Sequence, residues 1–192
     1  MASMGTTADV RIPMRPLSVD DFERMVAAGI LGEDDRVELL KGQLSEMGPH
    51  SAEHAGILQW LAEELISAID RDVAGVRVQL PLRFVPLSEP EPDIAIVPAG
   101  VNTHQHPTRA LLVIEVAMTS RALDLGTKAE VYAAADVAEY WVIDIAARVI
   151  HVHRTPSGGA FCSIEQVTCG SLRPDVPRAP AIDVEELFLL LD

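Results

Sequence analysis

Residues 111–118 read LLVIEVAM, an apolar run that is interrupted by one charged residue, Glu115. A continuous apolar stretch of this length is typical of a β-strand that is buried on both faces. Burying an ionised carboxylate without a partner costs several kcal/mol, so the side chain of Glu115 needs a cation beside it. This stretch therefore predicts the centre of a sheet and a charged site within it.

The sequence on both sides of this strand predicts alternating helices and strands. Helices are expected from the Ser18 cap to Gly29 and over 52–70, 126–135 and 183–191, where capping residues precede apolar side chains at helical spacing. Strands are expected over 36–40, 43–47, 76–85, 93–97, 140–144, 149–153 and 160–167. The fold class that follows is α/β, with a mixed central β-sheet flanked by helices.

The length and composition of the sequence limit the number of domains and the class of protein. With 192 residues and 48% hydrophobic residues, the chain is long enough for one domain, which we expect over residues 17–192. Residues 1–16 contain no apolar core of a secretion signal and are expected to be a flexible leader. The apolar runs are too short to span a membrane, and only two cysteines are present, which suits the cytoplasm.

Three carboxylates fall on three predicted strands. Glu38 lies inside RVELL, Asp93 begins DIAIV, and Glu115 lies in the strand described above. If these strands are neighbours, the acids can meet at one end of the sheet and hold a divalent cation, since Mg²⁺ prefers oxygen ligands. Lys128 follows on the next helix, from which its ammonium group could reach the same site and hold an attacking water.

The alternation of side chains along a strand indicates which face would carry this site. Val113, Glu115 and Ala117 point to one side, and the intervening residues point to the other. The small Ala117 leaves room beside Glu115 for a substrate or a lysine.

Structural interpretations of the same residues stay open from the sequence. Glu115 could pair with a buried arginine, Arg77 or Arg83, because ion pairs also bury charges. Lys128 could be an ordinary surface lysine. His54 lies on the apolar face of a helix, where a buried histidine with a hydrogen-bond partner is more common than a metal ligand.

The chain resembles the Uma-two family of bacterial restriction-endonuclease-like proteins, which belongs to the PD-(D/E)XK nuclease superfamily. The similar segments are VELLKGQL, His54 on the following helix, EPDIAIV, LLVIEVAMTS and DLGTKAEVYAAADVAEYWVID, which together cover about residues 17–170. The resemblance implies a restriction-endonuclease-like core. One difference is Ala117-Met118-Thr119-Ser120, where the family often has Ser-Pro-Ser/Thr.

The resemblance also implies a site and an activity. The implied catalytic residues are Asp93, Glu115, Lys128 and Glu38, with Asp93, Glu115 and the carbonyl of Val116 as ligands of Mg²⁺ or Mn²⁺. The lysine comes from a D-x₃-K-x₃-Y pattern, matched by Asp124, Lys128 and Tyr132. His54 is expected near the site as an accessory residue, through a contact with Glu38. The implied activity is metal-dependent endonuclease cleavage of phosphodiester bonds by a homodimer, with DNA favoured over RNA as the partner.

The net charge of −14 opposes a large duplex-binding surface, because affinity for phosphates depends on clustered lysine and arginine. A local collar of basic residues could still surround the site: Arg36, Lys41, Arg77, Arg83, Arg121 and Lys128. Two other functions therefore stay open. One is a non-catalytic interaction module on the same fold, and the other is a hydrolase of a small phosphate ester.

Overall fold

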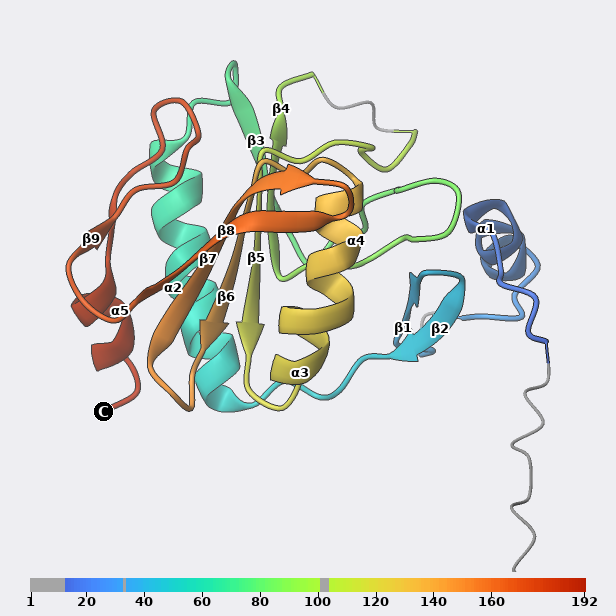
Figure 1. The fold of residues 1–192 in the computed structure, drawn as a ribbon, viewed down its shortest axis with the longest axis horizontal. Helices are drawn as coiled ribbons and strands as arrows, with labels where there is room; N and C mark the ends of the chain where they lie inside the picture. The colour runs from blue at the N-terminus through green and yellow to red at the C-terminus, as the bar shows by residue number, and fades with distance from the viewer. Residues whose placement is uncertain (1–12, 33, 101–103) are drawn as a thin grey trace, which may run out of the picture.

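A mixed β-sheet forms the centre of the computed structural model, which describes residues 13–32, 34–100 and 104–192 (Figure 1). Within these ranges the sheet has six strands in the order β3-β4-β5-β6-β7-β8. β5 and β6 run parallel, and the other neighbouring strands run antiparallel. The strands are β3 Ala74–Val78, β4 Ile94–Pro98, β5 Leu112–Ala117, β6 Glu139–Asp144, β7 Val149–Ser157 and β8 Ala160–Val167. The predicted α/β class is confirmed, and LLVIEVAM supplies β5, an interior strand that is buried along its length.

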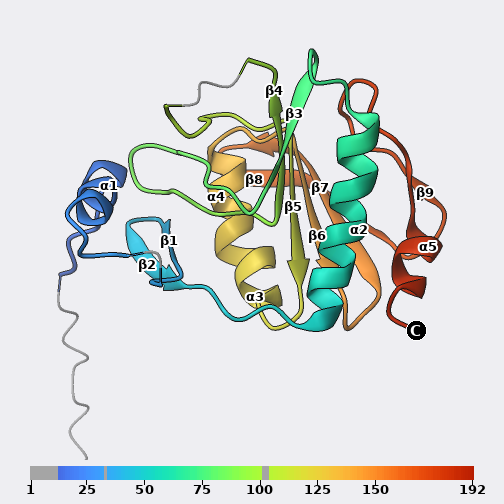
Figure 2. The same ribbon diagram turned by 180° about the vertical axis from the view of Figure 1, so that it is seen from behind.

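Helices cover both faces of this sheet (Figures 1 and 2). Helix α2, Ala52–Ala68, packs its apolar side chains on one face. The other face is covered by one continuous helical segment, which consists of α3 Arg121–Leu123, a π-helical turn η1 Asp124–Lys128, and α4 Ala129–Ala134. Leu112, Ile114 and Val116 of β5 pack on the α2 side, and Val113 and Ala117 pack on the α4 side. The predicted alternation is thus confirmed, and Glu115 shares the face that α4 covers.

The remaining elements lie at the two sides of the sheet. On one side, α1 Val19–Ala27 begins at a Ser18 capping box, and β1 Val37–Leu40 pairs with β2 Gln43–Glu46 in a separate hairpin. A bridge between Leu39 and Glu89 joins this hairpin to the segment before β4. On the other side lie β9 Ser171–Leu172, β10 Ile182–Asp183 and α5 Val184–Leu189.

Two predicted elements differ from the structure more than the others do. The strand expected over 76–85 ends at Val78, because Gln79 takes a left-handed conformation with φ of 49° and the following Pro81 lacks the N–H that a sheet ladder requires. The helix expected over 126–135 begins five residues earlier, at Arg121, and contains the π-helical turn.

Two histidines of β7, His151 and His153, belong to the interior of the protein. Both are buried on β7, and the ring of His153 packs beside Tyr140 and Phe161. Burial lowers the pKa of His153 to about 4, so this side chain is neutral and belongs to the core.

Most of the predicted N-terminal leader falls outside the part of the chain that the structure describes. Residues 1–12 of the expected leader lie outside the described residues, and the division into a leader over 1–16 and a domain over 17–192 stays a prediction. Within the described ranges, none of the helices has both the length and the apolar character that are needed to cross a membrane.

The packing of α2 on the sheet predicts the effect of truncating its inner face. Leu61 is fully buried against the sheet, whereas Ile66 on the same helix is 49% exposed. We expect Leu61→Ala to lower the free energy of unfolding by about 2–5 kcal/mol, because the change leaves a cavity. Ile66→Ala should change it by less than about 0.5 kcal/mol. Chemical denaturation followed by circular dichroism measures both, and equal losses would contradict this packing.

Candidate active site

The candidate site is a cavity of about 150 Å³ at the carboxyl end of β5. The same end of the sheet holds the start of β4, the first turn of α2 and the beginning of α3 (Figures 1 and 2). Among the described residues that line the cavity, one is a lysine, Lys128, and six are carboxylates: Glu38, Glu46, Glu91, Asp93, Glu115 and Asp124. The cavity therefore carries a strong excess of negative charge.

The strand register brings Asp93 and Glu115 together. β4 and β5 are antiparallel with Ile94 opposite Ile114, so the register carried one residue further sets Asp93 opposite Glu115. Directly opposite residues lie on the same face of a sheet, with Cβ atoms about 5 Å apart. The backbone N–H of Val116 donates to Asp93 Oδ2 at 2.8 Å, which holds the aspartate against β5. The two acids that were predicted as metal ligands are thus neighbours on the α4 side.

Lys128 lies between two of the predicted acids. Its Nζ is 3.0 Å from Glu115 Oε1 and 3.1 Å from Glu38 Oε1, and all three residues are buried. Glu38 reaches the site from the β1–β2 hairpin, and its other oxygen accepts the backbone N–H of Glu91. The partner of Glu115 is therefore Lys128, and not Arg77 or Arg83.

Tyr132 and Asp124 complete the α4 side of the site. The hydroxyl of Tyr132 donates to Glu115 Oε1 at 2.6 Å. Asp124 accepts a hydrogen bond from the Ser120 hydroxyl, and its backbone carbonyl accepts one from the hydroxyl of Tyr140 at 2.9 Å. Asp124 and Lys128 are the two ends of the π-helical turn, a local widening of the helix that is frequent at functional sites.

His54 approaches from the other side of the cavity. Its Nε2 lies 3.1 Å from Asp93 Oδ2, so its neighbour is Asp93 and not Glu38, as the sequence suggested. His50 stacks on His54 with ring centroids 4.3 Å apart. One ligand atom each from His50, His54 and Asp93 lie within 4.8 Å of one another, which is a spacing that could hold a metal ion.

Burial and neighbouring groups shift the pKa values of the acids in different directions. Burial raises the pKa of Glu115 well above its usual value, although Lys128 lowers it in part. Burial also raises the pKa of Asp93, but the hydrogen bonds and charge of His54 together with the Val116 N–H outweigh this effect and leave that pKa below the usual value. Burial raises the pKa of Asp124 to about 6.

The pKa of Lys128 moves in the opposite sense to that of an isolated buried lysine. Burial lowers the pKa, but the charges of Glu115, Glu38 and Asp124 raise it by more, so it stays above its usual value. The lysine is therefore a permanent cation at neutral pH, and its charge is what keeps Glu38 and Glu115 compatible with burial.

Most residues of the predicted basic collar form ion pairs with acidic side chains of the protein itself. Lys41 pairs with Glu130, Arg83 pairs with Asp20 and Glu23, and Arg121 pairs with Asp144. Lys128 is held by its own acids. A broad positive surface around the cavity does not result from these residues.

His50 and Gln79 were missed by the sequence reasoning. Gln79 Nε2 lies 3.2 Å from His50 Nδ1 and 3.5 Å from Asp93 Oδ1, so it links the histidine to the aspartate. The spacing of four residues between His50 and His54 was a signal for His50, since two histidines at that spacing beside a helix can share a ligand. Nothing in the sequence marked Gln79, which reaches the site only because β3 ends at Val78.

Comparison with known proteins identifies the family and the fold of the chain. A family model, Uma2, described as a putative restriction endonuclease, matches residues 19–183. The chain belongs to the Uma2 family. A crystal structure of a putative nuclease belonging to DUF820 from Anabaena variabilis ATCC 29413 shares the fold, with a TM-score of 0.73 and 17% sequence identity over 92% of this chain and 100% of that chain. A comparison with curated proteins found no match.

The fold of this Uma2 protein is therefore restriction-endonuclease-like, as the sequence predicted. Within that fold, an ionised aspartate, a glutamate that needs a cation and a permanent ammonium group line one cavity. Such a set can bind a divalent cation and hold a water molecule beside it.

The position of Lys128 predicts that its removal is costly. Lys128→Met leaves Glu38 and Glu115 buried without their cation, which should lower the free energy of unfolding by about 3–5 kcal/mol at neutral pH. The pKa of Glu115 then rises further. An acid whose folded-state pKa is raised loses stability as the pH rises toward that pKa. Because the pKa of Glu115 is already raised in the wild-type protein, the additional loss in the variant should develop only as the pH rises above that wild-type value.

Denaturation curves of the two proteins across this pH range measure the effect. Lys41→Met is the matched control, because Lys41 pairs with Glu130 at the surface and should contribute less than about 1 kcal/mol. A loss in Lys128→Met that is equally small, or that shrinks as the pH rises, would show that the lysine does not hold the acids.

Proposed function

We propose that this protein is a metal-dependent endonuclease that hydrolyses phosphodiester bonds of nucleic acid. The observation that carries the proposal is the meeting of Asp93, Glu115 and Lys128 in one cavity, from two adjacent strands and the helix that crosses them. The family description and the shared fold support the class of activity. A gathered set of these three residues favours chemistry over the alternative of a non-catalytic interaction module.

The residues present fit a divalent cation. Six carboxylates and one lysine line the cavity among the described residues, and hard cations such as Mg²⁺ and Mn²⁺ take oxygen ligands. Lys128 and Tyr132 both contact Glu115 through Oε1, which leaves Oε2 as the ligand oxygen in this proposal. Asp93, Glu115 and the carbonyl of Val116 would hold the ion, as expected from the sequence.

A bound cation would act as a Lewis acid on the phosphate and lower the pKa of an attacking water. The chain's own residues would do the rest. Asp93 stays ionised, and His54 and the Val116 N–H orient it. Lys128 is fixed by Glu38 and Glu115, so its remaining N–H can position the water and offset charge that develops on the phosphate. Tyr132 fixes the rotamer of Glu115.

The expected substrate is nucleic acid, with DNA favoured over RNA. The net charge of −14 and the paired arginines argue against a long duplex footprint, so a single strand or a short end suits this surface better. A homodimer in the cytoplasm, with one active site for each strand, completes the proposal as the sequence suggested it.

Replacing Glu115 with glutamine tests the activity directly. We expect Glu115→Gln to remove Mn²⁺-dependent cleavage of single- and double-stranded substrates, because the variant loses a metal ligand and the charge that holds Lys128. The melting temperature should change little, since Lys128 keeps Glu38 as its charged partner and the glutamine side chain keeps an oxygen that accepts a hydrogen bond. Glu165→Gln on the exposed strand β8 is the matched control. Undiminished cleavage by Glu115→Gln would refute the role of this residue.

The choice between two metal sites needs a separate experiment, because His50, His54 and Asp93 form a second possible donor set. If the cation lies on Asp93 and Glu115, Glu115→Gln should weaken Mn²⁺ and Mg²⁺ binding by about 10- to 100-fold or more, and His50→Ala should leave it unchanged. Isothermal titration calorimetry with each metal alone measures both. The reverse pattern would move the ion to the histidine side.

A further inference from the structure

The side chain of Arg36 carries a positive charge that forms no ion pair with an acid among the described residues. Four other members of the predicted basic collar form ion pairs: Lys41, Arg83, Arg121 and Lys128. Arg77 is half-buried and donates to the carbonyl of Pro81. Arg36 is exposed, and a guanidinium keeps its proton in proteins. Within the described part of the chain, Arg36 is therefore the exposed and unpaired cation of this collar.

The β1–β2 hairpin places Arg36 at the rim of the candidate active site. Its carbonyl accepts the backbone N–H of Met47 at 2.8 Å, which extends the ladder of the hairpin by one residue, and Met47 lines the cavity. Residues two positions apart on a strand share a face, so Arg36 lies on the same face as Glu38. Glu38 enters the cavity and contacts Lys128. Arg36 therefore lies on the cavity side of the hairpin, one step nearer the solvent.

A contact with His50 holds the guanidinium beside the cavity. Nη2 of Arg36 lies 3.2 Å from Nε2 of His50, and His50 lines the cavity. Because a guanidinium can only donate, the ring nitrogen accepts this hydrogen bond. A ring nitrogen of His50 lies within 4.8 Å of a carboxylate oxygen of Asp93. The ring of His50 therefore separates Arg36 from one of the acids that would hold the cation.

Most hydrogen-bond donors of Arg36 are left for a ligand. A guanidinium carries N–H groups on each of its nitrogens, and the contact with His50 occupies one of them. The structure shows no acceptor for the others in the described part of the chain. A free guanidinium fork matches two oxygens of a phosphate group, to which arginine donates in a bidentate pair. Arg36 is therefore suited to an anionic oxygen ligand that passes the mouth of the cavity.

We propose that Arg36 binds a backbone phosphate of the nucleic acid, next to the phosphate that is cleaved. The inference rests on the proposed function, which supplies the identity of the ligand. The cleaved phosphate would lie against the cation on Asp93 and Glu115, so the exposed guanidinium meets a neighbouring one. With a net charge of −14 on the protein, a single contact of this kind gives binding that is modest and sensitive to salt.

Binding in the absence of cleavage tests this contact. Fluorescence anisotropy of labelled oligo(dT) in EDTA, which prevents metal-dependent hydrolysis, gives Kd over a series of low salt concentrations. We expect Arg36→Ala to weaken binding about 10-fold, which is the order of one charge-assisted hydrogen bond. The slope of log Kd against log salt concentration should fall by about 0.7, the contribution of one phosphate contact on a single strand.

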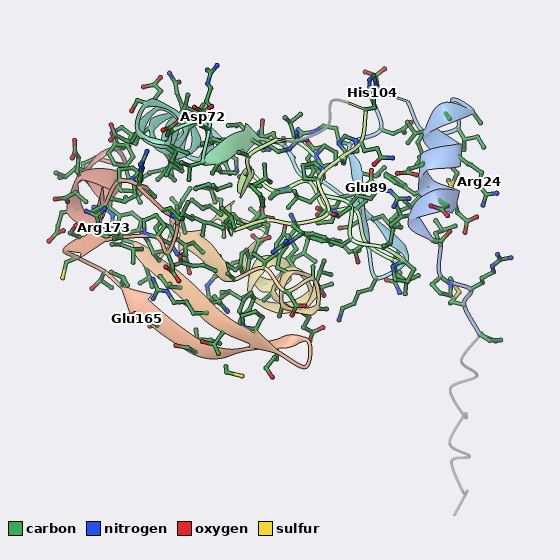
Figure 3. The ribbon with its side chains drawn as sticks, turned by 90° about the horizontal axis from the view of Figure 1, so that it is seen from above. Arg24, Asp72, Glu89, His104, Glu165 and Arg173 are labelled. Carbon is green, nitrogen blue, oxygen red and sulfur yellow. The ribbon has the colours of Figure 1, made fainter. Side chains whose placement is uncertain are left out.

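Two further variants separate this contact from a general change in charge. Arg173→Ala is the matched control, because it removes an exposed arginine beside β9, at the opposite end of the molecule from the β1–β2 hairpin (Figures 1 and 3). It should leave Kd and the salt slope unchanged. Arg36→Lys keeps the charge and loses the planar fork, so the salt slope should stay at its wild-type value while the affinity falls in part.

Cleavage with Mn²⁺ adds a kinetic measurement. A contact with a neighbouring phosphate is made equally in the ground state and the transition state. We therefore expect Arg36→Ala to raise KM about 10-fold and to leave kcat within about twofold. A lower kcat at an unchanged KM would overturn the assignment to a neighbouring phosphate.

The outcomes decide the contact independently of the activity. Wild-type affinity and salt slope in Arg36→Ala, or no binding of oligo(dT) by the wild-type protein, overturn the contact even if the protein cleaves nucleic acid. Binding that depends on Arg36 in a protein that cleaves nothing with Mn²⁺ keeps the phosphate contact and overturns the proposed activity. If Arg36→Ala does not fold, Arg36→Gln replaces it, with the same losses expected.

Discussion

The ion pair of Lys128 with Glu38 and Glu115 is the interaction on which the site depends. It joins three parts of the molecule: the β1–β2 hairpin, the central strand β5 and the helical segment that covers β5. A carboxylate in the middle of a buried strand is acceptable only with a cation at contact distance, and Lys128 is that cation. The π-helical turn ends at Lys128 and has Asp124 at its other end. Local helix geometry and site electrostatics are therefore linked.

The cavity around this ion pair carries more negative than positive side chains. A single lysine among six carboxylates, counted over the described lining residues, does not neutralise the site, so the remaining charge favours a divalent cation. Asp93 is central to this balance because it faces both possible donor sets. It lies opposite Glu115 across the sheet register and contacts His54 on the other side. The pKa of Asp93 stays below its usual value, whereas burial raises the pKa of Glu115.

The irregular segment between β3 and β4 lines two cavities. One is the candidate active site, and the other is a larger cavity of about 1010 Å³ on the α1 side. Its ends carry Gln79 and Asp93 into the candidate active site, and its middle carries Leu80 and Glu89 into the larger cavity. This segment is rich in proline and pairs with the β1–β2 hairpin through Leu39 and Glu89. Its departure from regular strand geometry lets neighbouring residues face opposite cavities. One stretch of chain thereby lines both cavities.

The sequence by itself determined the type of the central elements and the identity of the central acid. A short run such as LLVIEVAM is typical of a strand that is buried on both faces of a sheet. Side chains alternate between the two faces of a strand, so Glu115 lies on the same face as Val113 and Ala117. The placement of acids on predicted strands added Glu38 and Asp93, the next predicted helix added Lys128, and family resemblance added Tyr132. These predictions rest on short-range periodicity, which a sequence states directly.

Only the tertiary structure decided which partner each group meets. Arg77 and Arg83 were the candidates to neutralise Glu115, and the structure places Lys128 beside it instead, because the helical segment that ends in α4 packs across β5. His54 was expected near Glu38 and contacts Asp93 instead, because the N-terminal turn of α2 lies over the start of β4. Gln79 reaches the site because β3 ends at Val78, and His50 reaches it by stacking on His54 at the start of α2. Contacts between segments far apart in the chain depend on how whole elements dock, and no local pattern encodes that geometry.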